Sequence, residues 1–453
     1  MRALRSSLGG RDAFAAGVTA LVAAHVGLLV LFDLASHPYW TLAFMALGFA
    51  GLWLVARSAR AGRVVGASSL LALAAVLRFL LLPLPPTLSD DVLRYLWDGR
   101  VVAAGFNPYE LSPRAPELEA LRDPLWEAMP HKEIETVYPP LALASFSIAA
   151  LLPRSLYVWK ALLGCIDLVA CLLLLRLAER RGLPGERVAL YAWNPLVTLE
   201  VAGMGHVDAL GVAATVACVL LLLPGARRVG SAAVAAAAGV AAKLVPLVAL
   251  PMWARQSRNP VRFLTISGGL SFAVLGGLAL SVGGIPPGLA RYAISWEFNG
   301  PLFEPLHRLL GALGAPDAVA WSLDGLKQVT GRHEMWNRFY PYRYPELLAK
   351  VALAAGLAWW VLRSLGRRDP IAGTGVLLAG VLLFSATLYP WYLLWILPWA
   401  ALCRQPAWLV LAALVQLSYL PQLTGVNLFP WVYLAIWVPF AVIWIARPRW
   451  STA

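Results

Sequence analysis

Residues 86–109 read PTLSDDVLRYLWDGRVVAAGFNPY, a dense polar run that follows three apolar segments of membrane-spanning length. Two adjacent acids, Asp90 and Asp91, lie near its start. The rest of the chain is so hydrophobic that a polar run of this kind requires a physical reason. We therefore interpret 84–137 as a large loop at the membrane surface, where ionisable groups often mark function.

The composition indicates a protein embedded in a membrane. Of the 453 residues, 60% are hydrophobic and only 13% are charged, whereas a soluble domain carries about 25% charged residues. Apolar stretches near the ~20 residues needed to cross a bilayer recur along the chain. We expect an all-α polytopic membrane protein with about 12–14 transmembrane helices. Four cysteines lie in or beside these stretches without metal or disulfide spacing, which indicates packing residues: Cys165, Cys171, Cys218 and Cys403.

The chain is expected to form a single membrane domain, 1–453, because no low-complexity linker and no repeat divides it. Two long polar stretches separate groups of apolar segments. The predicted parts are the N-terminal helices (1–83), a first external loop that carries the catalytic residues (84–137), core helices (138–285), a second external loop (286–347) and the C-terminal helices (348–453).

The placement of arginine predicts the orientation. A net charge of +13 could indicate nucleic-acid binding, but the arginines gather in short loops, as the positive-inside rule predicts, so we expect no nucleic-acid partner. Arginines near both termini place these termini in the cytoplasm: Arg2, Arg5, Arg11, Arg447 and Arg449. Both large loops then lie on the non-cytoplasmic face.

The number of crossings between the two loops stays open. The arginines at 255–262 should be cytoplasmic, which requires an odd number of crossings within 138–251. Three crossings satisfy the charge rule if the segments 138–153 and 231–251 are short, re-entrant or interfacial; their proline-rich ends make this plausible. Three crossings place His206 on the same side as the acidic loop, and five place it on the opposite side.

The two acids are predicted to open a helix that runs to about Ala104. Helical spacing places Asp90 near Arg94 and Asp91 near Tyr95, each pair four residues apart. Adjacent side chains on a helix point about 100° apart, so the two carboxylates are not expected to share a proton. The structural alternative is that both acids only cap the helix and that Asp90 pairs with Arg94.

The chain resembles a known superfamily in these motifs. SDDVLRYLWDGRVVAAGFNPY at 89–109 and ETVYPPLA at 135–142 are similar to the first external loop of the C-type integral-membrane glycosyltransferases (GT-C). The bacterial polyprenyl-phosphate-mannose-dependent mannosyltransferases are the nearest match. Three further motifs continue the resemblance in order: WNPLVTLEVAGMGHVDAL at 193–210, AAKLVPLVALP at 241–251 and LYPWYLLWILP at 388–398. The resemblance implies a GT-C-like fold.

The resemblance also implies an inverting glycosyltransferase. In that family the loop aspartate is a general base, which deprotonates an acceptor hydroxyl that attacks the anomeric carbon of a lipid-phosphate-linked sugar. A carboxylate ionised at neutral pH can accept this proton. Asp91 has the spacing to Tyr95 found in relatives with one Asp, whereas Asp90 matches the Asp of Asp-Glu pairs elsewhere in the superfamily. Both remain candidates for the catalytic base, with Asp91 favoured.

The partners implied are a polyprenyl-phosphate sugar donor, with mannose favoured, a glycan or glycolipid acceptor, and membrane lipid. The implied location is the bacterial inner membrane, with the active site on the extracytoplasmic face. The sequence has no glycine-rich phosphate loop and no dinucleotide fingerprint, which favours a lipid-linked donor over a nucleotide sugar. Relatives that use polyprenyl monophosphates imply that no metal and no other cofactor is needed.

Further polar residues are candidates for substrate contacts. An anionic phosphate needs cations nearby, and the candidates are Arg94, Arg100, Lys243 and His333. The candidates for sugar or acceptor contacts are Tyr95, Asp98, Tyr138, His206 and Asp208. The structural alternatives are a paired or solvated arginine, a lysine that reaches the interface, a polar turn, and aromatic anchoring around His333. Three C-terminal aromatic residues are expected to form an interfacial belt rather than a site: Tyr389, Trp391 and Tyr392.

Other functions remain open. Within enzymes, the alternative is transfer of another lipid-phosphate-linked sugar. A transporter or flippase of lipid-linked saccharides should show two related halves and ionisable groups near the membrane centre, whereas the acids here cluster in one external loop. A purely structural membrane protein predicts that the loop acids are dispensable.

Overall fold

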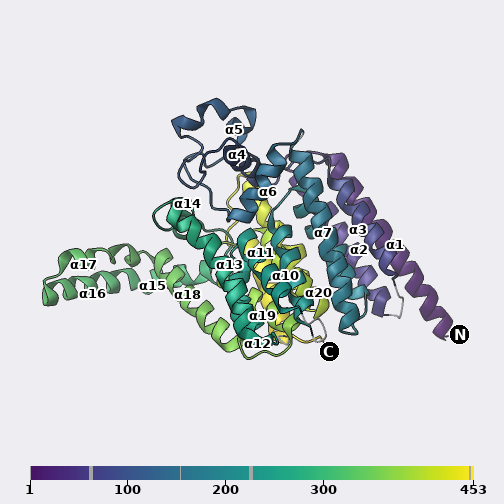
Figure 1. Cartoon of the computed structure of the whole chain (residues 1–453). Coiled ribbons are helices and arrows are strands. Elements are labelled where there is room, and N and C mark those ends of the chain that lie inside the picture. The colour runs from purple at the N-terminus through teal and green to yellow at the C-terminus, as the bar shows by residue number, and fades with distance from the viewer. Residues whose placement is uncertain (1, 61–64, 154, 224–227, 448–449, 453) are drawn as a thin grey trace.

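The computed structural model describes residues 2–60, 65–153, 155–223, 228–447 and 450–452, and Figure 1 shows a bundle of helices. Within these ranges no strand is assigned, and isolated β-bridges pair Thr387 with Phe298 and Asn299. The prediction of an all-α polytopic membrane protein is confirmed. Arg449, which the predicted orientation used, lies outside the described residues.

Twelve apolar helical stretches of the described residues form the body of the bundle. Six are long and apolar enough to cross a membrane: Asp12–Leu31 in α1 (Arg2–Leu31), Pro38–Ser58 in α2 (Pro38–Arg60), α7 (Ser155–Arg180), α13 (Pro260–Ser281), α18 (Pro345–Ser364) and the stretch Pro406–Thr424. Six are shorter: α3 (Ala67–Leu81), α6 (Pro140–Ala150), α10 (Asp208–Leu222), α11 (Val229–Ala242), α19 (Pro370–Leu383) and α23 (Trp431–Ala446). The figure of 12–14 membrane crossings remains a prediction.

Proline marks the beginning of many of these helices. Its fixed φ suits the first helical position, where its missing N–H has no partner to lose. The helices that begin on a proline include α2, α6, α13, α18, α19 and α21 (Pro406–Leu414). Buried apolar side chains from Leu21 to Trp450 then pack these helices into one continuous core.

Short and broken elements connect the apolar helices. In the first large loop these are α4 (Asp91–Ala103), η1 (Pro116–Leu121) and α5 (Pro124–Ala128). The middle of the chain has α8 (Glu186–Ala192), α9 (Pro195–Thr198), the π-helix η2 (Leu199–Gly203), η3 (Val245–Ala249) and α12 (Leu250–Gln256). The C-terminal part has η5 (Pro390–Trp395), α20 (Leu397–Leu402), η6 (Val415–Ser418) and α22 (Tyr419–Thr424).

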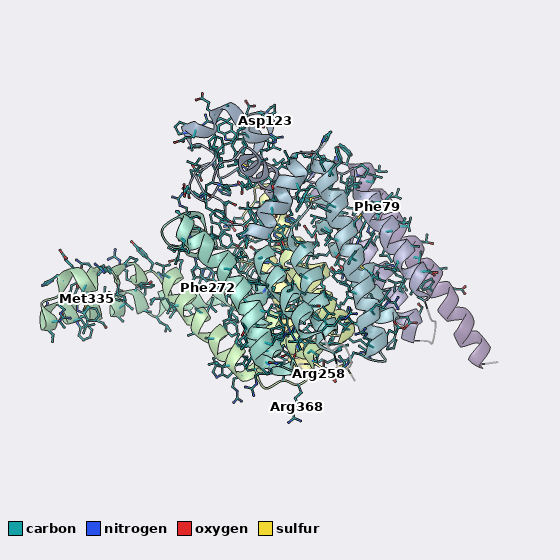
Figure 2. All side chains as sticks on the ribbon, viewed as in Figure 1. Phe79, Asp123, Arg258, Phe272, Met335 and Arg368 are labelled. Atoms are coloured by element: carbon teal, nitrogen blue, oxygen red, sulfur yellow. The ribbon has the colours of Figure 1, made fainter. Side chains whose placement is uncertain are left out.

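The two ends of the bundle differ in charge. Figure 2 shows Arg258 and Arg368 at one end and Asp123, in the first large loop, at the other. The C-terminal end of α7 lies at the arginine-bearing end, because Arg181 pairs with Asp369 at 3.1 Å. Helix α6 has only 11 residues, and the chain turns back after α11. The number of membrane crossings between 138 and 251 stays a prediction.

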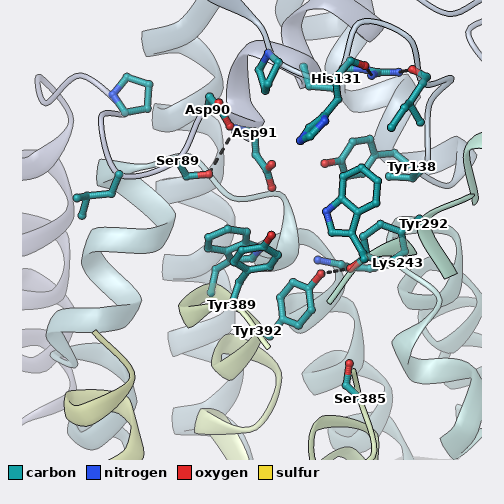
Figure 3. Close-up of a pocket in the computed structure, with 18 of the residues that line it drawn as sticks. Ser89, Asp90, Asp91, His131, Tyr138, Lys243, Tyr292, Ser385, Tyr389 and Tyr392 are labelled. Carbon is teal, nitrogen blue, oxygen red and sulfur yellow. Dashed lines mark hydrogen bonds between the residues drawn. The ribbon is translucent and has the colours of Figure 1, made fainter. Parts of the chain in front are cut away.

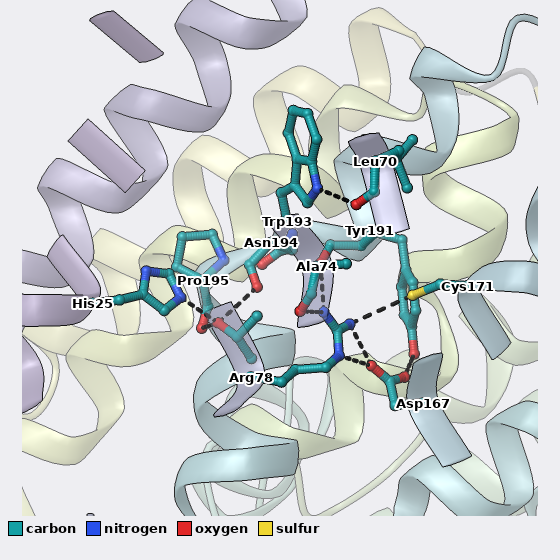
Figure 4. A network of polar contacts seen from close by, with 12 residues as sticks. His25, Leu70, Ala74, Arg78, Asp167, Cys171, Tyr191, Trp193, Asn194 and Pro195 are labelled. Atoms are coloured by element: carbon teal, nitrogen blue, oxygen red, sulfur yellow. Dashed lines mark hydrogen bonds and ion pairs between the residues drawn. The ribbon is translucent and has the colours of Figure 1, made fainter. Parts of the chain in front are cut away.

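A buried polar network holds the broken segment α8–η2 in place (Figure 4). Arg78 of α3 donates from Nε to Asp167 of α7 at 2.7 Å and from Nη1 to the carbonyl oxygen of Ala192 at 2.7 Å. The hydroxyl of Tyr191 also donates to Asp167. Removing one partner of a wholly buried ion pair costs about 3–5 kcal/mol, so this network fixes three helices relative to one another.

The second predicted loop forms an arm at the edge of the molecule. It contains α14 (Pro287–Ser295), α15 (Phe303–Ala312), α16 (Ala315–Thr330), α17 (His333–Asn337) and η4 (Tyr340–Arg343). Figure 1 shows α16 and α17 extending away from the bundle. By contrast, α14 stays against the first large loop, because Arg291 donates to the carbonyl oxygen of Glu133.

Candidate active site

Helix α4 presents the two acids of the opening motif at its N-terminus. The helix begins at Asp91, and the backbone N–H of Asp91 donates to Oγ of Ser89 at 3.4 Å. Gly99 lets α4 approach α6 closely, since a Cβ at this position would lie 2.4 Å from the carbonyl oxygen of Phe146. The local sequence thus fixes both the beginning of the helix and its contact with the bundle.

A cavity of about 930 Å³ opens beside this helix terminus. Its walls come from the first large loop, the end of α11, α14 and the C-terminal aromatic segment (Figure 3). The polar and aromatic residues that line it include Asp90, Asp91, Arg94, His131, Glu135, Tyr138, Lys243, Tyr292, Trp296, Tyr389, Trp391 and Tyr392. Residues far apart in the sequence therefore meet at one site.

Asp91 lies deep in the cavity wall. Its side chain is 34% exposed, toward the cavity, and the hydroxyl of Tyr95 donates to Oδ2 at 3.3 Å. The Tyr95 ring stacks on Phe146 with centroids 4.6 Å apart and meets Tyr138 edge-on at 4.9 Å. Burial and then the neighbouring charge of Asp90 raise the pKa of Asp91 to about 6. A carboxyl with this pKa is ionised at neutral pH and is a stronger base than an exposed one.

The structure corrects the predicted partner of Arg94. Its guanidinium donates from Nε to Asp98 at 2.7 Å and from Nη2 to the carbonyl oxygen of Ile134 at 2.7 Å, so it does not pair with Asp90 as helical spacing suggested. Arg94 still lines the cavity, but Asp98 is buried beneath it and is not among the lining residues. Both therefore help to shape the loop.

Two other predicted phosphate contacts lie away from the cavity. Arg100 pairs with Asp123 at 2.5 Å and is not among the lining residues. His333 is the first residue of α17, on the arm that extends from the bundle (Figure 1). The structure does not bring either residue to Asp91.

Lys243 supplies a cation to the site and is held there by an ion pair with Asp208. Lys243 follows the last residue of α11 and Asp208 is the first residue of α10, and their side chains meet at 2.6 Å. The indole of Trp395 also donates to Asp208 at 2.6 Å, and the ammonium lies 4.7 Å from the ring centroid of Tyr392. Asp208 is wholly buried, whereas Lys243 is 23% exposed and lines the cavity.

His206 lies behind Asp91, on the side of the acidic loop. Its Nδ1 atom is 3.8 Å from Oδ2 of Asp91, and its Nε2 atom is 3.3 Å from Oε2 of Glu200. The backbone turns sharply before it, since Gly205 has a φ of +83°. Glu200 was not among the predicted site residues, although its position in an apolar segment, six residues before a histidine, was a usable signal.

The C-terminal aromatic residues belong to the cavity, which corrects the expectation of an interfacial belt. Tyr389, Trp391 and Tyr392 all line it. Trp391 stacks on His206 with ring centroids 3.9 Å apart and on Tyr389 at 4.5 Å. Two more lining aromatics, Tyr292 and Trp296, come from α14 and the residue that follows it. Neither was among the predicted site residues, because only the packing of α14 brings them to the cavity.

No candidate metal site occurs in the described part of the chain. There, no group of three or more His, Cys, Asp or Glu side chains is arranged to hold an ion. The metal independence implied by the resemblance stays a prediction.

The helical membrane fold and the cavity with its carboxylate, lysine and aromatic rings fit an integral-membrane glycosyltransferase of the C type, and the family comparisons support this class. The chain belongs to the alpha-(1->6)-mannopyranosyltransferase family, whose N-terminal-domain model matches residues 10–257. The model of glycosyltransferase family 87 matches residues 136–390. The predicted resemblance is thus confirmed.

One curated relative is alpha-(1->6)-mannopyranosyltransferase A of Mycobacterium tuberculosis (strain ATCC 25618 / H37Rv). It is 26% identical to this chain over 352 residues, which are 74% of this chain and 64% of the relative. The chain therefore spans less than two thirds of the length of that relative. No solved structure matches this chain.

Proposed function

We propose that this protein transfers a sugar, with mannose favoured, from a polyprenyl-phosphate carrier to a glycan or glycolipid acceptor, with inversion at the anomeric carbon. The observation that carries the proposal is the position of Asp91, a carboxylate exposed to a large cavity across from a lysine. The alpha-(1->6)-mannopyranosyltransferase family and the named activity of the relative support mannose.

Asp91 is the proposed general base. Its carboxylate would take the proton of an acceptor hydroxyl while that oxygen attacks the anomeric carbon, and the bond between this carbon and the phosphate oxygen would break. Tyr95 supports Asp91 rather than the substrate, since its hydroxyl is committed to the Asp91 carboxylate. Asp90 also lines the cavity, and we assign it an electrostatic effect on Asp91 and no proton transfer.

Lys243 is the proposed contact for the leaving phosphate. A cation in a poorly solvated cavity stabilises the negative charge that collects on a leaving phosphate. Arg94 lines the same cavity, but three hydrogen bonds within the first large loop hold its guanidinium. Asp208 keeps Lys243 in position, and Tyr138 and the aromatic rings would contact the sugar faces.

The extracytoplasmic face of the bacterial inner membrane is the proposed location of the cavity. The support is the charge rule, because the arginine-bearing end of the bundle lies opposite the first large loop (Figure 2). Lipid-linked donors on that face need no nucleotide, which agrees with the absence of a nucleotide-binding motif from the sequence.

The test is transfer from radiolabelled polyprenyl-phosphate mannose by membranes containing the wild type, Asp91→Asn or Asp90→Asn. We expect Asp91→Asn to lose ~10²–10⁴-fold of the rate, the usual contribution of a general base, and Asp90→Asn to retain most of it. EDTA should leave the wild-type rate unchanged. Undiminished transfer by Asp91→Asn contradicts the assigned base, and transfer only from a different lipid-phosphate sugar corrects the donor.

A further inference from the structure

An imidazole lies between two carboxylates in the wall of the cavity. The two ring nitrogens of His206 point to different acids, Nδ1 to Asp91 at 3.8 Å and Nε2 to Glu200 at 3.3 Å. Asp91 is exposed to the cavity, whereas His206 is 1% exposed and Glu200 is wholly buried. The three groups therefore form a line from the cavity into the core.

Stacked aromatic rings fix the plane of this imidazole. His206 lies on Trp391 with an interplanar angle of 12°, Trp391 on Tyr389 at 6°, and Tyr389 on Phe298 at 14°. Neighbouring centroids along this column are 3.9, 4.5 and 4.4 Å apart. A ring held in such a column keeps both nitrogens directed at the same two acids. An indole face also stabilises a positively charged ring above it.

The far end of the line is held by the C-terminal helices. The hydroxyl of Tyr419 donates to Oε1 of Glu200 at 3.1 Å. The other oxygen, Oε2, has no hydrogen-bond partner, and neither nitrogen of His206 has one. Buried polar atoms without partners are costly, and here two of them, Nε2 of His206 and Oε2 of Glu200, lie 3.3 Å apart. Nδ1 of His206 faces Oδ2 of Asp91, which already accepts from Tyr95. A proton between Nε2 and Oε2 would give both of these atoms a partner.

We propose that Glu200 and His206 are positioning residues that receive, through Asp91, the proton taken from the acceptor. This inference rests on the proposed function. The neutral imidazole would carry its hydrogen on Nε2, directed at Glu200, which leaves Nδ1 free to accept. Asp91 removes the acceptor proton as the new C–O bond forms and the bond to the phosphate breaks. That proton then passes to Nδ1, which restores the Asp91 carboxylate and forms an imidazolium opposite Glu200.

The same logic of a histidine oriented by a buried acid operates in hydrolytic triads, where the acid stabilises the imidazolium. Here the histidine would act on a carboxylate base and not on a nucleophile. Its effect would be to return Asp91 to the ionised state while the products leave. The proton would then pass back from Nδ1 through Asp91 to water in the emptied cavity, which restores the neutral imidazole before the next turnover. Loss of the pair should therefore lower kcat more than it raises the KM for the donor.

The test compares His206→Ala, His206→Gln and Glu200→Gln with the wild type, using polyprenyl-phosphate mannose and added imidazole. We expect His206→Ala to lose ~10²-fold in kcat with a nearly unchanged KM, and added imidazole to restore much of that rate. The cavity left by the side chain would adjoin Asp91 and Trp391, which both line the open cavity. Glu200→Gln should lose about 10-fold, and combining it with His206→Ala should add little.

The matched control is His25→Ala, which removes another histidine that is 1% exposed. Unlike His206, this histidine is hydrogen-bonded, to Thr198 at 2.8 Å. Imidazole should not restore any rate that this variant loses. If His206→Ala does not fold, His206→Gln and Glu200→Gln carry the test. Wild-type kcat in both of these variants, or an active His206→Ala that imidazole does not stimulate, overturns the inference. Failure of the proposed function looks different: the wild type then transfers nothing, or Asp91→Asn transfers normally.

Discussion

The guanidinium of Arg94 is bound to Asp98, with Nε 2.7 Å from Oδ1, one turn further along α4. This pairing commits the arginine to the loop and leaves the Asp91 carboxylate facing the cavity, where Tyr95 donates to it. The pKa of Asp91 therefore depends on Asp90 and Tyr95, and each of these can be substituted separately.

Asp90 should set the pH at which the enzyme becomes active. Burial and the charge of Asp90 raise the pKa of Asp91 to about 6, so a base with this pKa is active above that pH and is lost as the pH falls through it. We expect kcat/KM of the wild type to fall by half near pH 6. In Asp90→Asn the pKa should drop and this midpoint should move to lower pH. An unchanged midpoint would show that another group controls the acid limb.

Tyr95 should have the opposite effect on the same profile. The hydrogen bond from its hydroxyl stabilises the ionised carboxylate and lowers the pKa of Asp91. Tyr95→Phe removes this bond but keeps the ring stacked on Phe146. The acid midpoint should therefore move to higher pH, with a loss of about 10-fold or less in rate at pH 8. A shift to lower pH, in the direction expected for Asp90→Asn, would contradict this account.

Substitutions of Lys243 and Asp208 should affect the stability of the protein and the rate of sugar transfer differently. Lys243→Met leaves the wholly buried Asp208 without its cation, which should cost about 3–5 kcal/mol and lower the apparent melting temperature in detergent. Adding Asp208→Asn removes the unpaired charge and should recover much of that loss. Transfer should remain low in the double variant, because the phosphate still lacks its cation. A double variant with wild-type donor KM would exclude Lys243 from phosphate binding.

The parts of the site that depend on local spacing could be predicted from the sequence. Asp91 and Tyr95 are one helical turn apart, and the structure joins them. Arg94 lies one helical turn from two acids, Asp90 and Asp98, and only the pairing with Asp90 was predicted. Helical spacing could not choose between them, because the choice depends on a carbonyl oxygen at Ile134 from another part of the loop.

The remaining contacts depend on packing between distant helices. Lys243 and Asp208 each stood out as polar residues in apolar surroundings, but no sequence rule joined them, because α10 and α11 have to pack before their ends meet. The same holds for His206 and Asp91, which the number of membrane crossings could have placed on opposite sides. The aromatic residues Tyr389 and Trp391 resembled an interfacial belt. Their place in the cavity lining, with Trp391 stacked on His206 and Tyr389 on Trp391, distinguishes them from one.

The close approach of α4 to α6 should be necessary for activity, although no substrate contact lies there. In Gly99→Ala the new Cβ would meet the carbonyl oxygen of Phe146 at 2.4 Å. Backbone cannot move aside as a flexible side chain can, so α4 should shift, at a cost of about 1–3 kcal/mol. Because Asp91 is the first residue of this helix, we expect reduced transfer together with a lower apparent melting temperature.

The matched control is Gly268→Ala on α13, where a new Cβ would have no atom within 4 Å. Alanine is favoured over glycine inside a helix by about 0.5–1 kcal/mol, so this variant should be as active as the wild type and at least as stable. The two substitutions add the same methyl group, and only the space around it differs. If Gly99→Ala matches Gly268→Ala in both measurements, the contact between α4 and α6 does not hold Asp91 in place, and the position of that carboxylate must depend on Tyr95 and on the walls of the cavity instead.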